Sequence, residues 1–173
     1  MSPMVRRPPG IELALLGFLQ HGPQHGYQIH LLLADSSGLG TIWHLKQSQL
    51  YALLVRLEKD GLIRGELENQ ESARPPRRVY HLTRAGQTAY HNWLRSPVGV
   101  PRLVRQEFMA KYFFVLRENE DLARKLVNLQ MVVCQAWLKK MLADQVADQP
   151  FHQALQLYRQ GQITATLKWL ESL

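Results

Sequence analysis

Residues 62–83 read LIRGELENQESARPPRRVYHLT and contain two short stretches in which apolar and polar residues alternate. Alternation with a period of two predicts a strand with one buried face, so we expect strands at residues 62–68 and 77–83. The polar, proline-containing residues 69–76 between them predict a turn. The segment therefore predicts a β-hairpin with a long basic tip, with Arg74, Arg77 and Arg78 in or beside it.

Helices are predicted on both sides of this hairpin. Before it, apolar residues at helical spacing predict three short helices, at residues 11–20, about 25–36 and about 47–60. The third helix carries leucines at positions 50, 53, 54 and 57, and Gly61 lies where a glycine commonly ends a helix. After the hairpin, Thr83 is a good N-cap for a helix at about 84–95. This element order is that of a winged helix-turn-helix domain, with the hairpin as the wing.

The rest of the chain predicts an all-helical second domain, so the predicted fold is mainly α. We expect a flexible arm at residues 1–10, the winged-helix domain at 11–95, a linker at 96–101 and helices throughout 102–173. The long apolar stripes of these helices exceed what a lone three-helix bundle requires, which predicts packing on a second copy of the chain. The expected dimerisation residues are Phe108, Tyr112, Leu122, Leu126, Leu129, Val133, Trp137 and Met141. The alternative is that aromatic and methionine side chains of this half line a pocket for a small-molecule effector.

The charge balance and the single cysteine limit the class of protein. The chain has 21 Lys and Arg against 14 Asp and Glu, a formal net charge of +7. This excess favours nucleic acid or an anionic membrane surface as partner, although a solvated basic surface gives the same total. Cys134 lies in the apolar run MVVCQAW, which predicts a buried inert thiol, and no apolar run approaches the ~20 residues that span a bilayer. We therefore expect a cytoplasmic protein that does not contact a membrane.

The polar face of the predicted third helix suits the major groove of double-stranded DNA. It lies opposite the leucines at about 100° per residue, and its small side chains, such as Ala52, permit contact with a thymine methyl group. Glutamines at the N-terminal turn, such as Gln49, can bond adenine bidentately, and Tyr51 on the flank can reach a phosphate. The candidate DNA contacts are Lys46, Gln47, Ser48, Gln49, Tyr51, Ala52, Val55, Arg56 and Lys59. A solvated helix surface is the alternative interpretation.

The wing explains why arginines surround a Pro-Pro pair. Two strands project the tip from the core, and the prolines stiffen it, which lowers the entropy lost when Arg74 and Arg77 contact DNA. The planar guanidinium pairs with phosphates and enters narrow minor grooves. Arg78 is also a candidate contact, but it shares a face with Tyr80, so anchoring of the hairpin is its alternative role.

Enzymes and metal sites are not favoured. His21 and His25 have the spacing of a helical zinc site, but Gly22-Pro23 breaks the helix between them. No nucleophile elbow, phosphate-binding glycine loop or paired-carboxylate arrangement is present in the sequence. We therefore expect no catalytic residues, no metal and no cofactor.

Four segments resemble the PadR family of bacterial transcription regulators: LALLGFLQHGPQHGYQI (13–29), LYALLVRLEKDGLI (50–63), RRVYHLTRAGQTAYHNWL (77–94) and PRLVRQEFMAKYFF (101–114). The last is similar to the start of the helical C-terminal domain in the longer, AphA-like subgroup. The resemblance implies a winged-helix DNA-binding domain, a helical dimerisation domain and binding to an inverted-repeat operator near a regulated promoter. Two candidate functions follow: a dimeric DNA-binding regulator acting as a repressor, or a winged-helix protein-interaction module that does not read DNA.

Two positions bear on how far the resemblance extends. Many family members read Gly-Ser-Leu-Tyr-Pro where this chain has Ser48-Gln49-Leu50-Tyr51-Ala52, so the operator sequence does not carry over. Some members bind drugs between paired tryptophans in a central dimer pore. Trp93 lies instead in the helix after the wing, so that mode of ligand binding is not supported.

Overall fold

The computed structural model describes residues 10–68, 77–143 and 149–173. The chain forms two compact units. The first contains the described residues up to Leu94 together with Arg105–Phe114, and the second contains Arg95–Val104 and Val115–Leu173. The sequence had placed residues 105–114 in the second domain, whereas they pack in the first unit.

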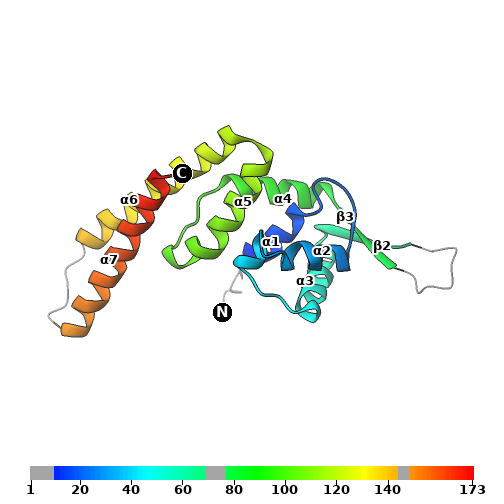
Figure 1. The fold of residues 1–173 in the computed structure, drawn as a ribbon, viewed down its shortest axis with the longest axis horizontal. Coiled ribbons are helices and arrows are strands. Elements are labelled where there is room, and N and C mark those ends of the chain that lie inside the picture. The colour runs from blue at the N-terminus through cyan, green and yellow to red at the C-terminus, as the bar shows by residue number, and fades with distance from the viewer. Residues whose placement is uncertain (1–9, 69–76, 144–148) are drawn as a thin grey trace, which may run out of the picture. The chain divides into compact units, whose positions relative to one another are not determined.

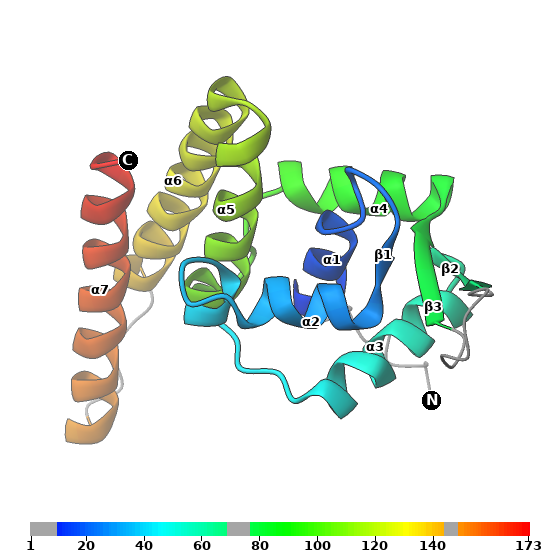
Figure 2. The same cartoon turned by 45° about the vertical axis from the view of Figure 1, so that its right-hand side comes forward.

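The first unit has the predicted winged helix-turn-helix order (Figure 1). Its helices and strands are α1 (Gly10–Gly17), β1 (Gln24–His25), α2 (Gly26–Ala34), the 3-10 turn η1 (Leu39–Thr41), α3 (Gln47–Lys59), β2 (Ile63–Glu68), β3 (Arg77–Leu82) and α4 (Arg84–Arg95). In Figures 1 and 2, α2 and α3 lie side by side and the hairpin follows directly from α3. The fold class predicted from the sequence is confirmed.

The sheet has one strand more than predicted. Its order is β1-β3-β2 and both pairings are antiparallel, with Gly65 opposite Tyr80 and Gln24 opposite the same tyrosine on the other side. The two residues of β1 were expected to begin the second helix or to lie just before it. Because β3 is the central strand, its pairing with β1 ties the wing to the segment that leads into α2.

A single apolar core holds the first unit together. Leucines from α1, α2 and α3 are buried in it, together with Ile63 of β2, Tyr80 of β3 and Tyr90 of α4. The leucines of α3 that follow the helical spacing are divided between the core (Leu50, Leu54 and Leu57) and a half-buried position (Leu53). The apolar face of α3 is therefore used for packing, which leaves its opposite face free.

Residues 105–114 complete this core. They form the end of a π-helical segment (Val104–Phe108) and the start of α5 (Met109–Glu118). The Phe114 ring packs edge-on against Phe18 and Tyr90, at centroid distances of 5.5 and 5.8 Å. Phe108 is fully buried. It is thus inaccessible to a second copy of the chain, and its predicted role in dimerisation is replaced by one in the core.

A buried charge pair fixes the same segment. The Lys111 ammonium lies 3.2 Å from Glu107 Oε1 and 5.4 Å from the centre of the Trp93 ring. Glu107 Oε1 also accepts a hydrogen bond from Trp93 Nε1 at 3.0 Å. Burial lowers the pKa of Lys111, while the Glu107 carboxylate opposes that shift. Removing one partner would leave a buried charge uncompensated. The pair therefore favours the one position of this segment in which Glu107 and Lys111 meet.

The second unit is built on two long helices, α6 (Glu120–Ala143) and α7 (Pro150–Glu171), which lie side by side (Figure 1). Asn119 caps α6, accepting hydrogen bonds from the N–H groups of Asp121 and Leu122 at 2.7 and 3.2 Å. Gln130 is buried, and its amide binds both the N–H and the carbonyl of Val98. The predicted burial of Cys134 is confirmed, and that burial raises the pKa of its thiol. In the parts of the chain that the structure describes, no helix has the length and apolarity needed to cross a bilayer.

Candidate nucleic-acid interface

The outer face of α3 is exposed along its whole length. Leu50, Leu54 and Leu57 are buried, whereas 62% of the Val55 side chain on the opposite face is exposed. Every candidate contact predicted on or before this helix is exposed: Lys46, Gln47, Ser48, Gln49, Tyr51, Ala52, Val55, Arg56 and Lys59. The structure therefore leaves these nine side chains exposed at the start of α3 and along it, and we call them together the α3 face.

The start of α2 packs on the Tyr51 ring. A Cβ atom at Gly26 would lie 2.7 Å from Tyr51 Cε1, so a larger residue there would have to displace the Tyr51 ring. Tyr27, the next residue, is 57% exposed. Tyr27 was not among the candidate contacts predicted from the sequence.

The N-terminus of α3 is capped by one of the candidate contacts. Gln49 Oε1 accepts a hydrogen bond from the backbone N–H of Lys46 at 3.0 Å. Gln28 does the same for His25 at the start of α2, at 2.8 Å. This bond satisfies an N–H group at the helix start. The bidentate contact predicted between Gln49 and adenine would therefore have to replace the bond to Lys46.

Arg56 is held by a buried carboxylate. Its Nη1 lies 2.9 Å from Oε1 of Glu12, which is buried on α1. Burial raises the pKa of the Glu12 carboxyl, and Arg56 partly offsets the shift. Arg56 is therefore tied to the core at the edge of the α3 face, although its side chain remains 44% exposed.

The end of α3 is fastened to the wing by a three-part clamp formed by Glu58, Gly65 and Arg78. Nη2 of Arg78 donates to both carboxylate oxygens of Glu58, at 2.6 and 2.7 Å. Glu58 Oε1 also accepts from the Gly65 N–H at 2.9 Å, and a Cβ at Gly65 would overlap the Arg78 side chain. The Arg78 guanidinium lies 6.0 Å from the centre of the Tyr80 ring. These contacts favour hairpin anchoring, the alternative role predicted for Arg78.

The clamp predicts a dependence of stability on pH. The Arg78 hydrogen bonds are the main cause that lowers the pKa of Glu58 from its ordinary value of 4.5. A carboxylate with a lowered folded pKa stabilises the fold above its unfolded value and loses that contribution as the pH falls through the folded value. We expect Glu58→Gln to lower Tm by about 1–3 °C at pH 7, and the difference from wild type to shrink as the pH falls below 4.5 through the lowered pKa of Glu58. Thermal unfolding between pH 3 and 7 measures this, with Glu171→Gln as control. A constant difference at every pH would show that charge plays no part in the clamp.

The basic wing is only partly described. Arg77 is exposed on β3, opposite Glu68 of β2, and His25 Nε2 lies 3.5 Å from that glutamate. Arg74 lies outside the described residues. Within the described ranges, no group of three or more His, Cys, Asp or Glu residues could hold a metal ion.

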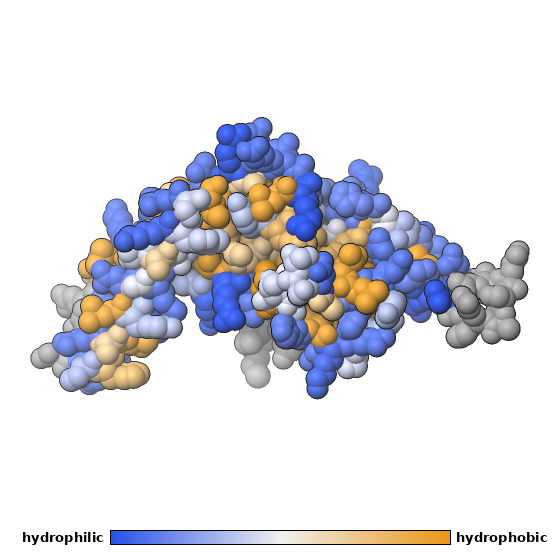
Figure 3. Space-filling view, viewed as in Figure 1, coloured by the Kyte–Doolittle hydropathy of each residue, from blue (hydrophilic) through white to orange (hydrophobic). Residues whose placement is uncertain are grey.

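The predicted dimerisation residues are divided by the structure. On α6, Leu126 is buried in the second unit, Leu129 is exposed, and Leu122, Val133, Trp137 and Met141 are half-buried, as is Tyr112 on α5. Five other apolar side chains are more exposed than Leu129 and were not among the predicted dimerisation residues: Val132, Leu142, Phe151, Leu157 and Tyr158. Figure 3 shows hydrophobic residues at the surface of the α6–α7 pair. We call these five residues, with Leu129, the α6–α7 apolar surface.

Comparison with known proteins identifies the family. The model of the transcriptional regulator PadR-like family matches residues 15–92. The negative transcriptional regulator PadR of Bacillus subtilis (strain 168) is 30% identical over 131 residues, which cover 76% of this chain and 70% of that protein. Among solved structures, B. subtilis PadR in complex with operator DNA is similar with 28% identity and a TM-score of 0.49, covering 94% of this chain and 96% of that one. The complex of the same protein with p-coumaric acid is similar with 26% identity and a TM-score of 0.44, covering 96% and 95%. This chain belongs to the PadR-like family of transcriptional regulators.

Proposed function

We propose that this protein is a dimeric transcriptional repressor that binds an inverted-repeat operator through the α3 face and the wing. The observation that carries the proposal is the separation of the two faces of α3. One face is fully used by the core, and the other presents nine exposed side chains of the types that contact bases and phosphates. The Glu58–Arg78 clamp holds the wing base beside this face, so that helix and hairpin meet one duplex together.

The α6–α7 apolar surface supports dimerisation. Two packed helices leave large apolar side chains such as Phe151, which is 73% exposed, without a covering element in the described chain. Large exposed apolar side chains that gather on a protein surface commonly mark an interface. A dimer formed through this surface would contain two α3 helices, and paired helix-turn-helix units usually bind half-sites about 34–36 Å apart.

Repression is proposed because the B. subtilis relative is a negative transcriptional regulator. The alternative, a winged-helix interaction module, would have no use for an exposed polar α3 face beside a basic wing. The two functions differ in one inexpensive measurement, binding of generic duplex DNA at low salt. Absence of binding would support the interaction module.

The proposal predicts the salt dependence of DNA binding. Each phosphate paired with a cationic side chain contributes about 0.9 to the slope of log affinity against log salt. We expect the double change Arg74→Ala with Arg77→Ala to weaken binding to all sequences and to reduce the slope by up to about two units. Arg102→Ala with Arg159→Ala, both exposed in the second unit, removes the same charge and is the control. Equal slopes for the wing variant and wild type would remove the wing from the interface.

A further inference from the structure

The ion pair between Glu12 and Arg56 joins the interior of the first unit to its surface. Arg56 Nη1 lies 2.9 Å from Oε1 of Glu12, which is 2% exposed, whereas the arginine side chain is 44% exposed. In the Glu107–Lys111 pair, by contrast, the lysine itself is only 1% exposed and serves the core alone. The first pair therefore connects a buried carboxylate to a cation of the α3 face.

Burying the Glu12 carboxylate is unfavourable unless a cation lies beside it. Burial raises the pKa of the Glu12 carboxyl, Arg56 opposes that shift, and the Asp60 carboxylate adds to it. Within the described residues no hydrogen-bond donor is well aligned on Glu12 Oε1, so the charge of Arg56 is its main compensation. An apolar side chain would fill the same space without a buried charge, so packing alone does not account for the carboxylate.

The ion pair leaves other donors of Arg56 available. A guanidinium carries its N–H groups in a rigid planar fork, and Glu12 faces only the Nη1 end of it. A carboxylate at one end of the fork fixes the direction of the whole plane. The remaining N–H groups can then pair with a second anion, and phosphate oxygens are the anions that a DNA duplex offers.

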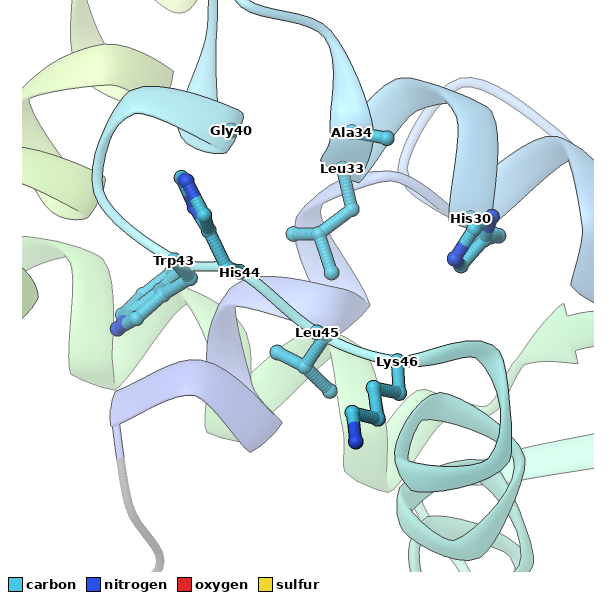
Figure 4. Close-up of a pocket in the computed structure, with 8 residues that line it drawn as sticks. All are labelled: His30, Leu33, Ala34, Gly40, Trp43, His44, Leu45 and Lys46. Carbon is cyan, nitrogen blue, oxygen red and sulfur yellow. The ribbon is translucent and has the colours of Figure 1, made fainter.

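Lys46, at the other end of α3, provides a contrast. Figure 4 shows its side chain extending from the segment that leads into α3, and none of the eight residues that line this cavity is acidic. Lys46 therefore has to be ordered by the DNA itself, at the expense of side-chain entropy. Arg56 has already lost part of this freedom in the unbound protein, because Glu12 holds it.

We propose that Glu12 is a positioning residue for DNA binding, which holds Arg56 so that its remaining N–H groups meet a backbone phosphate beside α3. Glu12 itself is buried and does not contact the duplex. Ordering a long side chain in advance corresponds to a factor of about two to ten in affinity. The contact is to phosphate, so it strengthens binding to all sequences alike. The proposal rests on the proposed function of the α3 face.

The direction of the effect of Glu12→Gln separates positioning from simple charge. The substitution keeps the shape of the side chain and removes one negative charge near the α3 face, which by itself strengthens attraction to a polyanion. Loss of positioning has the opposite effect. We expect the protein concentration for half-saturation of generic duplex DNA at low salt to rise at least about threefold. Binding that is equal to wild type or tighter would overturn the proposal.

A double-mutant comparison assigns the effect to Arg56. Glu12→Gln is expected not to weaken binding in a chain that also carries Arg56→Gln, and to have its full effect beside Lys59→Gln. Lys59 is the matched control, because it is the other cation in the last turn of α3. Asp121→Asn breaks an exposed carboxylate–arginine pair in the second unit and is expected to leave DNA affinity unchanged. Equal weakening by Glu12→Gln in every background would make Glu12 a structural residue only.

The salt dependence separates the contact from its positioning. Arg56→Gln is expected to reduce the slope of log affinity against log salt by about 0.9 for each arginine that meets a phosphate. Glu12→Gln is expected to leave the slope unchanged, because the number of paired phosphates stays the same. An unchanged slope for Arg56→Gln would show that Arg56 meets no phosphate and would overturn the proposal.

A measurement on the unbound wild-type protein needs no variant to fold. Side-chain nitrogen NMR is expected to give separate signals for the two Nη atoms of Arg56, because the ion pair slows rotation of the guanidinium. Averaged signals would show that Glu12 does not hold it, and would refute the positioning role while the proposed function stands. DNA binding without coupling between Glu12 and Arg56 would do the same. A wild-type protein that binds no duplex DNA at low salt would refute both.

Discussion

A chain shortened to residues 1–118 is expected to fold and to be monomeric. Its affinity for the operator is expected to be lower than that of the full chain by a factor of about 100 or more. It keeps Arg105–Phe114, which pack in the first unit, and therefore keeps the Phe114 and Lys111 contacts that complete the core. It loses α6 and α7, which carry the proposed dimer surface. Tethering two DNA-binding units commonly multiplies affinity by about 10²–10⁴, and this factor is lost when each half-site is bound separately.

A second truncation, to residues 1–100, serves as the comparison. It removes Phe108 and Phe114 from the core and leaves the Trp93 indole without Glu107, so we expect no cooperative thermal unfolding. Analytical ultracentrifugation gives the mass of the folded fragment, and titration of operator DNA, found by sequencing co-purified fragments, gives the affinities. A 1–118 fragment that is dimeric with full affinity would refute the assignment of dimerisation to α6 and α7.

The placement of residues 105–114 shows a limit of prediction from the sequence. The helices and the hairpin were predicted because their periods of 3.6 and two are local properties of the chain. The same periodicity predicted which residues of α3 are exposed, and that exposure is confirmed, while their contacts with DNA remain predictions. Residues 105–114 were assigned to the wrong unit because a helical period does not reveal which core a helix enters. Phe108 illustrates this: its spacing predicted an apolar seam, and the seam lies inside the winged helix.

Partners of charged side chains were predicted less well than their exposure. Arg56 and Arg78 lie on the expected faces, yet each is bound to a carboxylate from an element distant in the sequence, Glu12 and Glu58 respectively. The residues between such partners do not encode the pairing, which arises only when the helices and strands pack. For Arg78 the shared strand face with Tyr80 was a usable local signal, whereas nothing near Arg56 indicated Glu12. The two-residue β1 was missed for a similar reason, because its pairing with β3 depends on tertiary structure.

The change Gly86→Ala is expected to destabilise the protein by about 3 kcal/mol or more, the largest effect of a single substitution that we predict. Gly86 lies in the first turn of α4, where a Cβ atom would overlap the carbonyl oxygen of Leu62 and lie 2.9 Å from its carbonyl carbon. It would also lie 2.8 Å from Leu82 Cδ1. The main obstacle is backbone rather than the end of a flexible side chain, so rotamer changes cannot relieve it.

The surrounding hydrogen bonds prevent the backbone from moving away. The Thr83 hydroxyl donates to the carbonyls of Leu62 or Gly61, at 3.0 and 2.7 Å, and accepts from the Gly86 N–H at 3.0 Å. The Thr83 N–H also donates to the Leu62 carbonyl at 3.1 Å. Shifting α4 to admit a methyl group would break these bonds and move the end of β3. This contact gives a physical reason for the threonine and glycine of the LTRAG segment.

Thermal and urea unfolding of Gly86→Ala and of Gln87→Ala, its exposed neighbour on α4, measure the effect. The control is expected to change stability by less than about 0.5 kcal/mol, because surface substitutions without specific contacts rarely do more. A loss of about 3 kcal/mol should lower Tm by about 6–12 °C in a chain of this size. The displaced β3 would also carry Arg78 away from Glu58 and so release the wing from α3. Arg77 would then contact phosphates less often, and the folded fraction of Gly86→Ala should bind DNA with a smaller salt slope. If Gly86→Ala unfolds at the same temperature as Gln87→Ala, then the Leu62 carbonyl does not closely approach α4. The base of the wing would then not be fixed by this contact. Simultaneous contact of the hairpin and α3 with one duplex requires that it is fixed.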